Sequence, residues 1–325
     1  MSIAAETRPP VPRSVEGAAP GWLRGIFIAN LVAQMGIVVT GGVVRVTGSG
    51  LGCPTWPECV EGSYTPTARQ EEQWHKYVEF GNRTLTFLLG VLALAAIVGA
   101  IAWYARSRRN GIPGRVPVLV LAAVPLAGTV AQAVLGGITV LTGLNPWVVS
   151  GHFLLSIAII AGCTLLVVRA GEAGDEPVTP LVRPEVRWMG RALVLVTFVV
   201  VVLGTVVTGS GPHSGDVDTE ARFGLDPRMV SWLHADVVLL FLGLTIGMLV
   251  VLQVTDGPRR ARAMCLALLL VAVAQGVIGY TQYFSGLPWA LVTVHMLGAT
   301  LVWVLSLLLL LRLRSRGPVG TTAAG

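Results

Sequence analysis

Residues 191–211, RALVLVTFVVVVLGTVVTGSG, decide what kind of protein this is. After Arg191 this stretch carries no charged side chain. A helix of about 20 such residues is long enough to cross the apolar core of a bilayer. The stretch also ends in Thr-Gly-Ser-Gly, a sequence that closes an earlier apolar run at 47–50. Together the two features predict a membrane protein with an internal repeat.

The same apolar character recurs along the whole chain. Its 325 residues are 54% hydrophobic and 12% charged, with a mean hydropathy of +0.73, whereas soluble domains carry about 25% charged residues. This composition excludes a soluble enzyme, a nucleic-acid module and a disordered protein. We predict an all-α integral membrane protein with eight transmembrane helices. They are placed near 22–46, 78–104, 116–141, 148–169, 191–209, 230–252, 262–283 and 289–312.

The Lys and Arg residues are spread unevenly between these spans, and this predicts the orientation. An even number of spans puts both termini on one side. Of the 23 basic residues, 17 fall on the side of the termini. The other six are Arg45, Arg69, Lys76, Arg83, Arg222 and Arg228. By the positive-inside rule, the chain is a multi-pass protein of the cell membrane with both termini cytoplasmic. The pI near 9.6 then reflects orientation and anchoring at membrane lipid, with no nucleic-acid partner.

An internal repeat relates the two parts of the chain. Ala131-Gln132, followed by Gly143-Leu144, recurs as Ala274-Gln275 followed by Gly286-Leu287. The spacing from Gln132 to His152 equals that from Gln275 to His295. Chance similarity of apolar helices is the alternative, but it does not explain a spacing shared by several features. We therefore predict two pseudo-symmetric four-helix bundles, related by an axis along the membrane normal.

The repeat divides the chain into five segments. The polar tails are predicted to be cytoplasmic, and the first of them, rich in Pro and Ala, to be disordered and not a signal peptide. The predicted segments are a tail at 1–21, an N-terminal half at 22–170, a linker at 171–190, a C-terminal half at 191–312 and a tail at 313–325.

Three of the five histidines lie inside spans, where ionisable residues are rare and usually functional. His152, His234 and His295 sit about 6–12 Å below the outer surface at 1.5 Å per residue. Histidine is a common axial ligand of haem in helical bundles, so His234 and His295 predict a bis-His haem in the second half. Hydrogen bonding between helices is the plainer alternative for each. His75 is expected at a loop–helix junction, and His213 is expected to be solvated or, less favoured, to touch a haem propionate.

The first half lacks a second histidine, because Asn82 stands where His234 stands in the repeat. Asparagine is a poor iron ligand but a good hydrogen-bond donor beside an open coordination site. Glu79, Asn82 and Arg83 share a helix face through their i, i+3 and i, i+4 spacing. Charges at this depth are costly unless paired or used. The three are therefore candidate catalytic residues, and a structural Glu79–Arg83 ion pair is the alternative.

The cysteines fall into two kinds. Cys53 and Cys59 flank a short segment of the first outer loop, on the oxidising side of the membrane, and predict a disulfide that is either structural or redox-active. Cys163 and Cys265 lie within spans and are expected to be small packing residues.

These features together resemble a known family, haem A synthase, which oxidises the C8 methyl of haem O to a formyl group. The resemblance covers about residues 22–312, and Glu79-x-x-Asn82-Arg83 belongs to it. Its most specific motifs are GSGLGCPxWPxC at 48–59, TGSGPHSGD at 208–216 and WLHAD at 232–236. Members of the family often have His where Asn82 stands, so the chain would be a variant with Asn at this position.

The resemblance implies roles for these residues. His234 and His295 would hold a haem b that carries electrons, and His152 would bind haem O, the substrate, beside the catalytic carboxylate Glu79, with haem A as product. We hypothesise that haem O is five-coordinate through His152, with an open face beside Asn82. An open face suits an oxidant at the iron, and a carboxylate base suits attack of water on a methyl group oxidised from outside. Both routes stay open.

The resemblance implies a haem O synthase and cytochrome oxidase assembly factors as partners. The electron donor and a homo-oligomeric state stay open.

Two other classes of protein compete with this interpretation. A non-catalytic b-type cytochrome fed by quinol explains the histidine pair but leaves Glu79 and the cysteines without a role. A small-solute transporter explains the repeat but predicts ligands near mid-membrane.

Overall fold

The protein was analysed as a computed structural model that describes residues 18–112, 114–216 and 221–316. Most of the predicted tails, at 1–17 and 317–325, lies outside the described residues. Within them the chain consists of helices, the loops between them and one short strand pair. The helices are α1 (Gly21–Val46), α2 (His75–Arg109), α3 (Val116–Ala122), α4 (Val124–Leu141), α5 (Pro146–Gly171), α6 (Pro184–Ser210), α7 (Pro227–Val254), α8 (Arg259–Phe284) and α9 (Trp289–Arg312), and the strands are β1 (Thr179–Pro180) and β2 (Arg314–Ser315).

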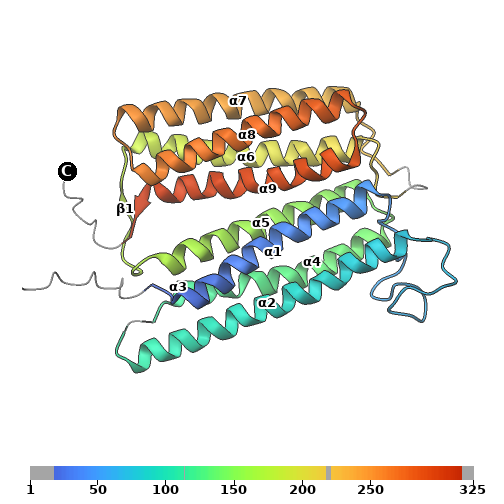
Figure 1. Ribbon diagram of the computed structural model, residues 1–325, viewed down its shortest axis with the longest axis horizontal. Helices are drawn as coiled ribbons and strands as arrows, with labels where there is room; N and C mark the ends of the chain where they lie inside the picture. The colour runs from blue at the N-terminus through green and yellow to red at the C-terminus, as the bar shows by residue number, and fades with distance from the viewer. Residues whose placement is uncertain (1–17, 113, 217–220, 317–325) are drawn as a thin grey trace, which may run out of the picture.

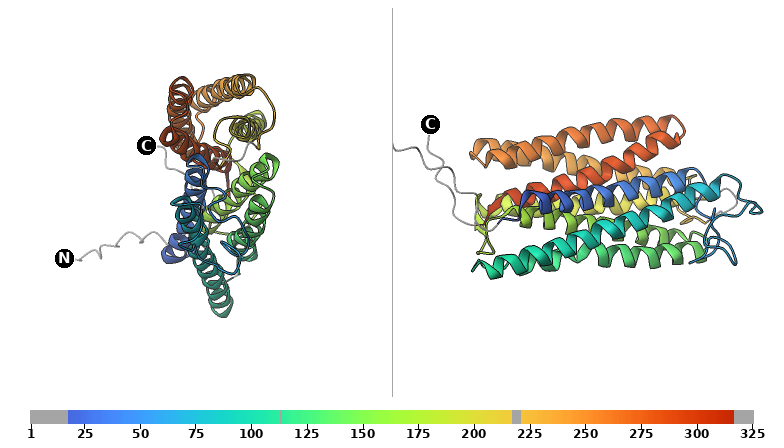
Figure 2. Two further views of the ribbon diagram at one scale, coloured as in Figure 1. Left: turned by 90° about the vertical axis from the view of Figure 1, so that its right-hand side faces the viewer. Right: turned by 60° about the horizontal axis from the view of Figure 1, so that its bottom comes forward.

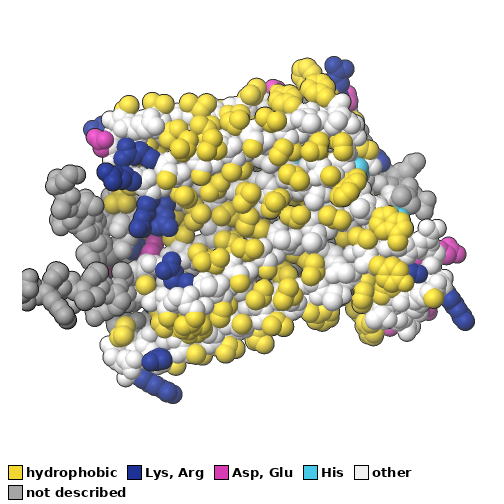
Figure 3. All heavy atoms as spheres, viewed as in Figure 1, with side chains coloured by type: hydrophobic (Ala, Val, Ile, Leu, Met, Phe, Trp, Pro, Cys, Tyr) yellow, Lys and Arg dark blue, Asp and Glu magenta, His cyan; other side chains and the backbone are white. Residues whose placement is uncertain are grey.

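Eight helical segments among the described residues are long and apolar enough to cross a membrane, with α3 and α4 together forming the third. The predicted all-α membrane architecture with eight spans is therefore confirmed. Figure 3 shows hydrophobic side chains over the middle of the visible face and Lys and Arg side chains toward its two ends. This is the surface expected of a bundle whose middle lies in lipid.

Two predicted spans differ from the structure for identifiable reasons. The third is interrupted after Ala122, because Pro125 has no N–H to donate to the carbonyl of Leu121 and its ring crowds that turn. The fifth begins at Pro184, not at residue 191, because a proline at the first helical position starts a helix well. The predicted linker at 171–190 therefore contains the first two turns of α6.

The helices form two groups that lie beside each other in Figure 1, α1–α5 below and α6–α9 above. In the first group the packing order around the ring is α1, α2, α4 and α5, and in the second it is α6, α7, α8 and α9. Figure 2 shows the two groups from the end of the bundle. The ring orders correspond, and the pseudo-two-fold relation between the groups stays a prediction.

The repeat also has a local counterpart in the backbone. The hairpin between α4 and α5 turns at Gly143 and Leu144, with φ of 60° and 58°, and the hairpin between α8 and α9 turns at Gly286 and Leu287, with φ of 79° and 59°. Leucine rarely adopts positive φ. The two sequence copies thus impose the same unusual turn.

The groups are held together by α1, α5, α6 and α9. Their shared core includes Met35, Ile160, Val201 and Val304. The Trp303 indole, buried in this core, donates a hydrogen bond from Nε1 to the carbonyl of Ile157 over 2.9 Å. We call this shared core and its hydrogen bond the seam between the two helix groups. The two ends of the bundle also differ. We call the end with the 47–74 segment the loop end, and the end where α9 meets β2 the basic end.

Candidate active site

The three intramembrane histidines lie at the loop end, about two turns into their helices. His152 is on α5, His234 on α7 and His295 on α9. The Nδ1 atom of each is buried and makes no hydrogen bond of ordinary geometry with any described residue. Buried polar atoms are nearly always satisfied, so each such exception needs an explanation. Three imidazoles with unused bonding capacity at one depth fit ligands of a bound group.

Each histidine ring packs against a glycine of the preceding helix. A Cβ at these glycines would lie 3.2 to 3.5 Å from the Cε1 atom of the ring. The pairs are Gly136 with His152, Gly204 with His234 and Gly279 with His295. Glycine thus lets each ring lie close to a neighbouring backbone.

The histidines also occupy diagonal positions within the helix rings. In the second group, α7 and α9 are opposite each other, and His234 and His295 are close enough to interact electrostatically. In the first group, α2 and α5 are the opposite pair, so Asn82 and His152 hold the corresponding positions. The donor set therefore fits a haem with two histidine ligands in the second group and with one in the first.

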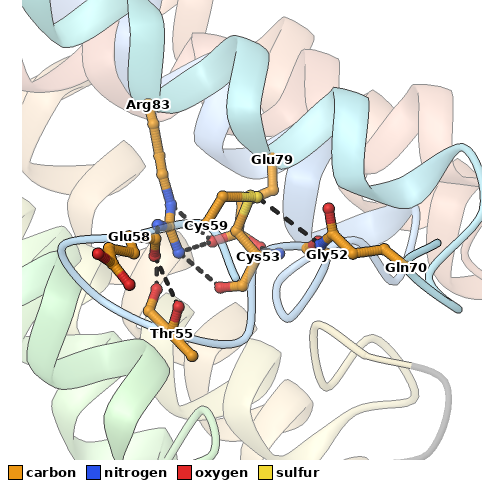
Figure 4. Close-up of polar contacts among 8 residues, drawn as sticks. All are labelled: Gly52, Cys53, Thr55, Glu58, Cys59, Gln70, Glu79 and Arg83. Carbon is orange, nitrogen blue, oxygen red and sulfur yellow. Dashed lines mark hydrogen bonds and ion pairs between the residues drawn. A yellow bond between two sulfur atoms is a disulfide. The ribbon is translucent and has the colours of Figure 1, made fainter. Parts of the chain in front are cut away.

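Glu79 joins α2 to the disulfide loop at 53–59 (Figure 4). Its Oε2 accepts a hydrogen bond from the backbone N–H of Cys53 over 2.6 Å, and its Oε1 lies 2.7 Å from Nη2 of Arg83. The Glu79 side chain is only 7% exposed. The ion pair suggested by the i, i+4 spacing is present, and it is part of a larger network.

Arg83 uses all five of its N–H groups in this network. Its Nε and Nη2 donate to Glu79, and Nη2 also donates to the carbonyl of Cys53 over 2.6 Å. Its Nη1 donates to the carbonyls of Thr55 and Glu58 over 3.1 and 3.2 Å. A guanidinium group has five donors in a fixed planar fork. Arg83 therefore holds the loop and has no donor left for another group unless one of these bonds breaks.

The loop itself is closed by a disulfide between Cys53 and Cys59, as the sequence predicts. Gln70 donates to the carbonyl of Gly52 over 3.2 Å from the other side (Figure 4). The remaining cysteines, Cys163 and Cys265, are free and buried within helices, which confirms their expected packing role.

Trp56 brings the loop over the first group of helices. A Cβ on Gly137 would lie 2.4 Å from the indole ring of Trp56, and the adjacent Gly136 contacts the ring of His152. Two consecutive glycines of α4 therefore pack against two rings: Gly137 against the indole of the loop and Gly136 against the imidazole of α5. This contact places the disulfide loop next to His152, and neither Trp56 nor Gly137 was among the candidates from sequence.

Asn82 is oriented by a residue that sequence reasoning also missed. Oγ1 of Thr40, on α1, lies 2.7 Å from Oδ1 of Asn82 and 3.2 Å from the carbonyl of Ile37. A hydroxyl has one hydrogen, and the shorter distance assigns it to Asn82. The Asn82 amide nitrogen makes no hydrogen bond with the described residues, so it keeps two donors.

The two remaining histidines have structural partners. His75 is the first residue of α2, at the loop–helix junction as expected, and its Nδ1 lies 2.9 Å from Oγ of Ser49. His213 is not simply solvated, as the sequence favoured, because its Nε2 lies 3.0 Å from the carbonyl of Leu287. Arg45 in turn donates to the carbonyl of His213 over 2.9 Å. The Arg45 bond ties the loop ends of the two groups together, whereas the other two contacts each lie within one group.

The chain is similar in sequence to known proteins. A family model described as cytochrome oxidase assembly protein, COX15-CtaA, matches residues 24–213. A heme A synthase of Symbiobacterium thermophilum is 29% identical over 286 residues, which are 81% of this chain and 87% of the relative. A heme A synthase of Sphingopyxis alaskensis is 25% identical and covers 89% of this chain and 90% of its own length. A third, from Bacillus licheniformis, is 26% identical over 57% of this chain and 58% of the relative.

The fold and the site define a multi-pass helical membrane protein with inward-facing histidines under a disulfide-closed loop. The match extends over more than half of the chain. The chain belongs to the COX15-CtaA family, the haem A synthase family that its motifs resemble.

Proposed function

We propose that this protein is a haem A synthase, an oxidoreductase that converts the C8 methyl group of haem O to the formyl group of haem A. The observation that carries the proposal is the disulfide loop, which is held by the Glu79–Arg83 pair at one side and rests through Trp56 on the helix that contacts His152, within a member of this family. A b-type cytochrome that only transfers electrons needs no such network next to a single histidine.

The histidines divide between two sites. His234 and His295 would hold a haem b, which when bound supplies one-electron transfer. Their unsatisfied Nδ1 atoms and their positions on opposite helices support this assignment. His152, without a histidine opposite, would bind haem O as the substrate.

Glu79 is the candidate group for moving protons. Conversion of a methyl group and one water molecule to a formyl group releases four protons and four electrons, so the site needs a proton acceptor. A buried carboxylate can accept a proton, and in Glu79 the one lone pair that the three hydrogen bonds leave unused is on Oε2. Arg83 then acts as a positioning residue, because its donors are engaged by Glu79 and by the loop.

Asn82 replaces the second histidine in the substrate site. Thr40 holds its amide oxygen, which leaves the amide N–H groups free to donate, and α2 lies across the helix ring from α5, which carries His152. We therefore include an open face of haem O beside Asn82 in the proposal.

The proposal also includes the orientation with both termini in the cytoplasm, which the basic residues at the ends of α2, α5 and α9 support. A haem O synthase and cytochrome oxidase assembly factors are the proposed partners.

The experiment is production of haem A in a host that lacks it. The full chain is co-expressed with a haem O synthase, and extracted haems are separated by chromatography. Haem A, or hydroxylated haem O, is expected with the wild type. It should fall by about 10²-fold or more in Glu79→Gln, since a positioned base contributes about 10²–10⁴-fold. A haem O pool that stays unchanged with the wild type would refute the function.

Two controls separate chemistry from folding. Glu61→Gln alters an exposed carboxylate of the same outer segment and should leave haem A production unchanged. The amount of haem b that copurifies should be equal in Glu79→Gln and wild type. Loss of haem b together with haem A would show that Glu79 serves the structure and not the reaction.

A further inference from the structure

The basic end of the bundle contains a second concave site, far from the histidines. A pocket of about 580 Å³ lies where α3 and α5 of the first group meet β2, which follows α9 of the second. One part of its lining is apolar and the other is charged. The apolar residues are Val116, Pro117, Val120, Leu121 and Leu165, and the charged residues are Arg169, Asp175, Arg314 and Arg316.

The charged part carries more cations than the local carboxylates neutralise. Arg169 is buried and pairs with Glu172 and Asp175. Arg316 lies 3.6 Å from the same Glu172 carboxylate. The Arg314 guanidinium makes no hydrogen bond or ion pair with the residues that the structure describes. Arg115 also pairs with Asp175, so Arg115, Arg169 and Arg316 share two carboxylates, Arg314 adds a further cation, and the pocket keeps a net positive charge.

The surroundings of Arg314 show the effect of this excess. Burial lowers the pKa of Arg314, Glu172 raises it, and the neighbouring Arg316 and Arg169 lower it further. Arg314 lies just beyond the end of α9. Glu172, which Arg169 and Arg316 already share, is the carboxylate that offsets these cations at Arg314, so a further anion here would stabilise the guanidinium group.

The apolar part of the pocket faces the bilayer. Val120 is 63% exposed and Val116 is 50% exposed on α3, one turn apart, within a segment apolar enough to span the membrane. A free phosphate or a soluble anion would leave this surface unused. A zwitterionic lipid would bring its own cation toward Arg314.

We infer that this pocket binds an anionic phospholipid, with the phosphate against Arg314 and Arg316 and an acyl chain along Val120 and Leu165. Basic pockets between transmembrane helices are suited to such headgroups. Because its walls come from both helix groups, the lipid would join α3 and α5 to the chain end that follows α9. The inference does not depend on the proposed enzymatic function.

The test uses the full-length protein, purified in detergent and stripped of lipid. Phosphatidylglycerol, phosphatidylcholine and inorganic phosphate are added separately, and bound lipid is counted by native mass spectrometry while thermal unfolding is recorded. Phosphatidylglycerol is expected to bind and to raise the unfolding temperature, whereas phosphatidylcholine and phosphate do neither. Equal effects of the two lipids, or an effect of phosphate alone, would overturn the proposal.

Variants locate the site. The double variant Arg314→Gln/Arg316→Gln should weaken phosphatidylglycerol binding by about 25-fold, at about fivefold per cationic side chain. Arg108→Gln/Arg109→Gln removes two exposed arginines at the same end of the bundle, on α2, and should leave binding unchanged. Val120→Trp, which keeps every charge and narrows the apolar part, should weaken lipid binding as well. Equal losses in the two double variants would show that only general surface charge attracts the lipid.

Discussion

The backbone N–H of Cys53 donates a hydrogen bond to Oε2 of Glu79 over 2.6 Å, and this bond fixes the disulfide loop to α2. The same carboxylate is paired with Arg83, which in turn binds three carbonyls of the loop. The charges of Glu79 and Arg83, near the loop end of α2, are thereby matched to backbone dipoles. The candidate catalytic carboxylate and the loop over His152 are parts of one polar network.

Arg83→Lys is predicted to release this loop. Lysine keeps the positive charge but offers three donors on one nitrogen, so it cannot reach Glu79 and the loop carbonyls together. Loss of bonds to a charged partner should destabilise the docked loop by about 2 kcal/mol. The measurement is the rate at which Cys53 and Cys59 become alkylated under mild reductant, which should rise. Arg69→Lys, an exposed residue of the same outer segment, is the control and should leave the rate unchanged.

Asn82→His is predicted to close the proposed open face of haem O beside His152. With haem O bound, the wild type should show one six-coordinate low-spin haem and one haem that binds carbon monoxide. The variant should show two low-spin haems and weaker carbon monoxide binding, because imidazole is a strong axial ligand and an amide is not. Two bis-histidine spectra in the wild type would contradict the open face.

Thr40→Val tests how Asn82 is oriented. The variant keeps the shape of the side chain but removes the hydroxyl that lies 2.7 Å from the Asn82 oxygen. Carbon monoxide should still bind, but its stretching frequency should shift because the amide donors are no longer fixed toward the ligand. Thr86→Val, on α2, removes a hydroxyl that bonds only to the backbone of Arg83 and should not shift the frequency. An unshifted band in Thr40→Val would mean that Thr40 does not position the amide.

Gly137→Ala is predicted to move Trp56 away from the substrate site without altering any histidine. The added Cβ would lie 2.4 Å from the indole, which cannot bend out of the way as the end of a flexible chain does. Haem A production should fall while haem b content stays constant. Gly151→Ala on α5, where a Cβ meets nothing within 4 Å, is the matched control. Equal haem A yields in the two variants would show that docking of Trp56 is not needed.

The membrane architecture could be predicted from sequence because each span is a local property. The length of an apolar stretch is enough to identify a span. The repeat can likewise be recognised in the amino-acid sequence, from the match of Gly143-Leu144 to Gly286-Leu287. Pro125 is a helix-breaking residue, and its presence in the third span indicates a possible break. Hydropathy does not reveal this break, because the residues around Pro125 are uniformly apolar. The start of α6 was missed for the opposite reason, since its first turns carry polar residues near the membrane surface.

The site was predictable only in part, because its polar network depends on contacts distant in sequence. The spacing of Glu79 and Arg83 predicts their ion pair, since a helix brings i and i+4 together. Nothing local predicts that Cys53 would donate to Glu79, that Thr40 would bind Asn82 or that Trp56 would rest on Gly137. These contacts follow from how the loop folds back over the bundle. The sequence could therefore identify candidate residues but not the contacts that orient them.

Trp303→Phe is predicted to weaken the seam between the two helix groups. The substitution keeps the aromatic ring in the core with Ile160 and Val304 but removes the N–H that donates to the Ile157 carbonyl over 2.9 Å. A buried hydrogen bond of this kind contributes about 1 kcal/mol, so the thermal midpoint in detergent should fall by a few degrees. Trp188→Phe, which alters an exposed indole on α6, should change the midpoint little. If both variants unfold at the wild-type temperature, apolar packing alone holds the seam; a fall confined to Trp303→Phe assigns part of its stability to this one bond.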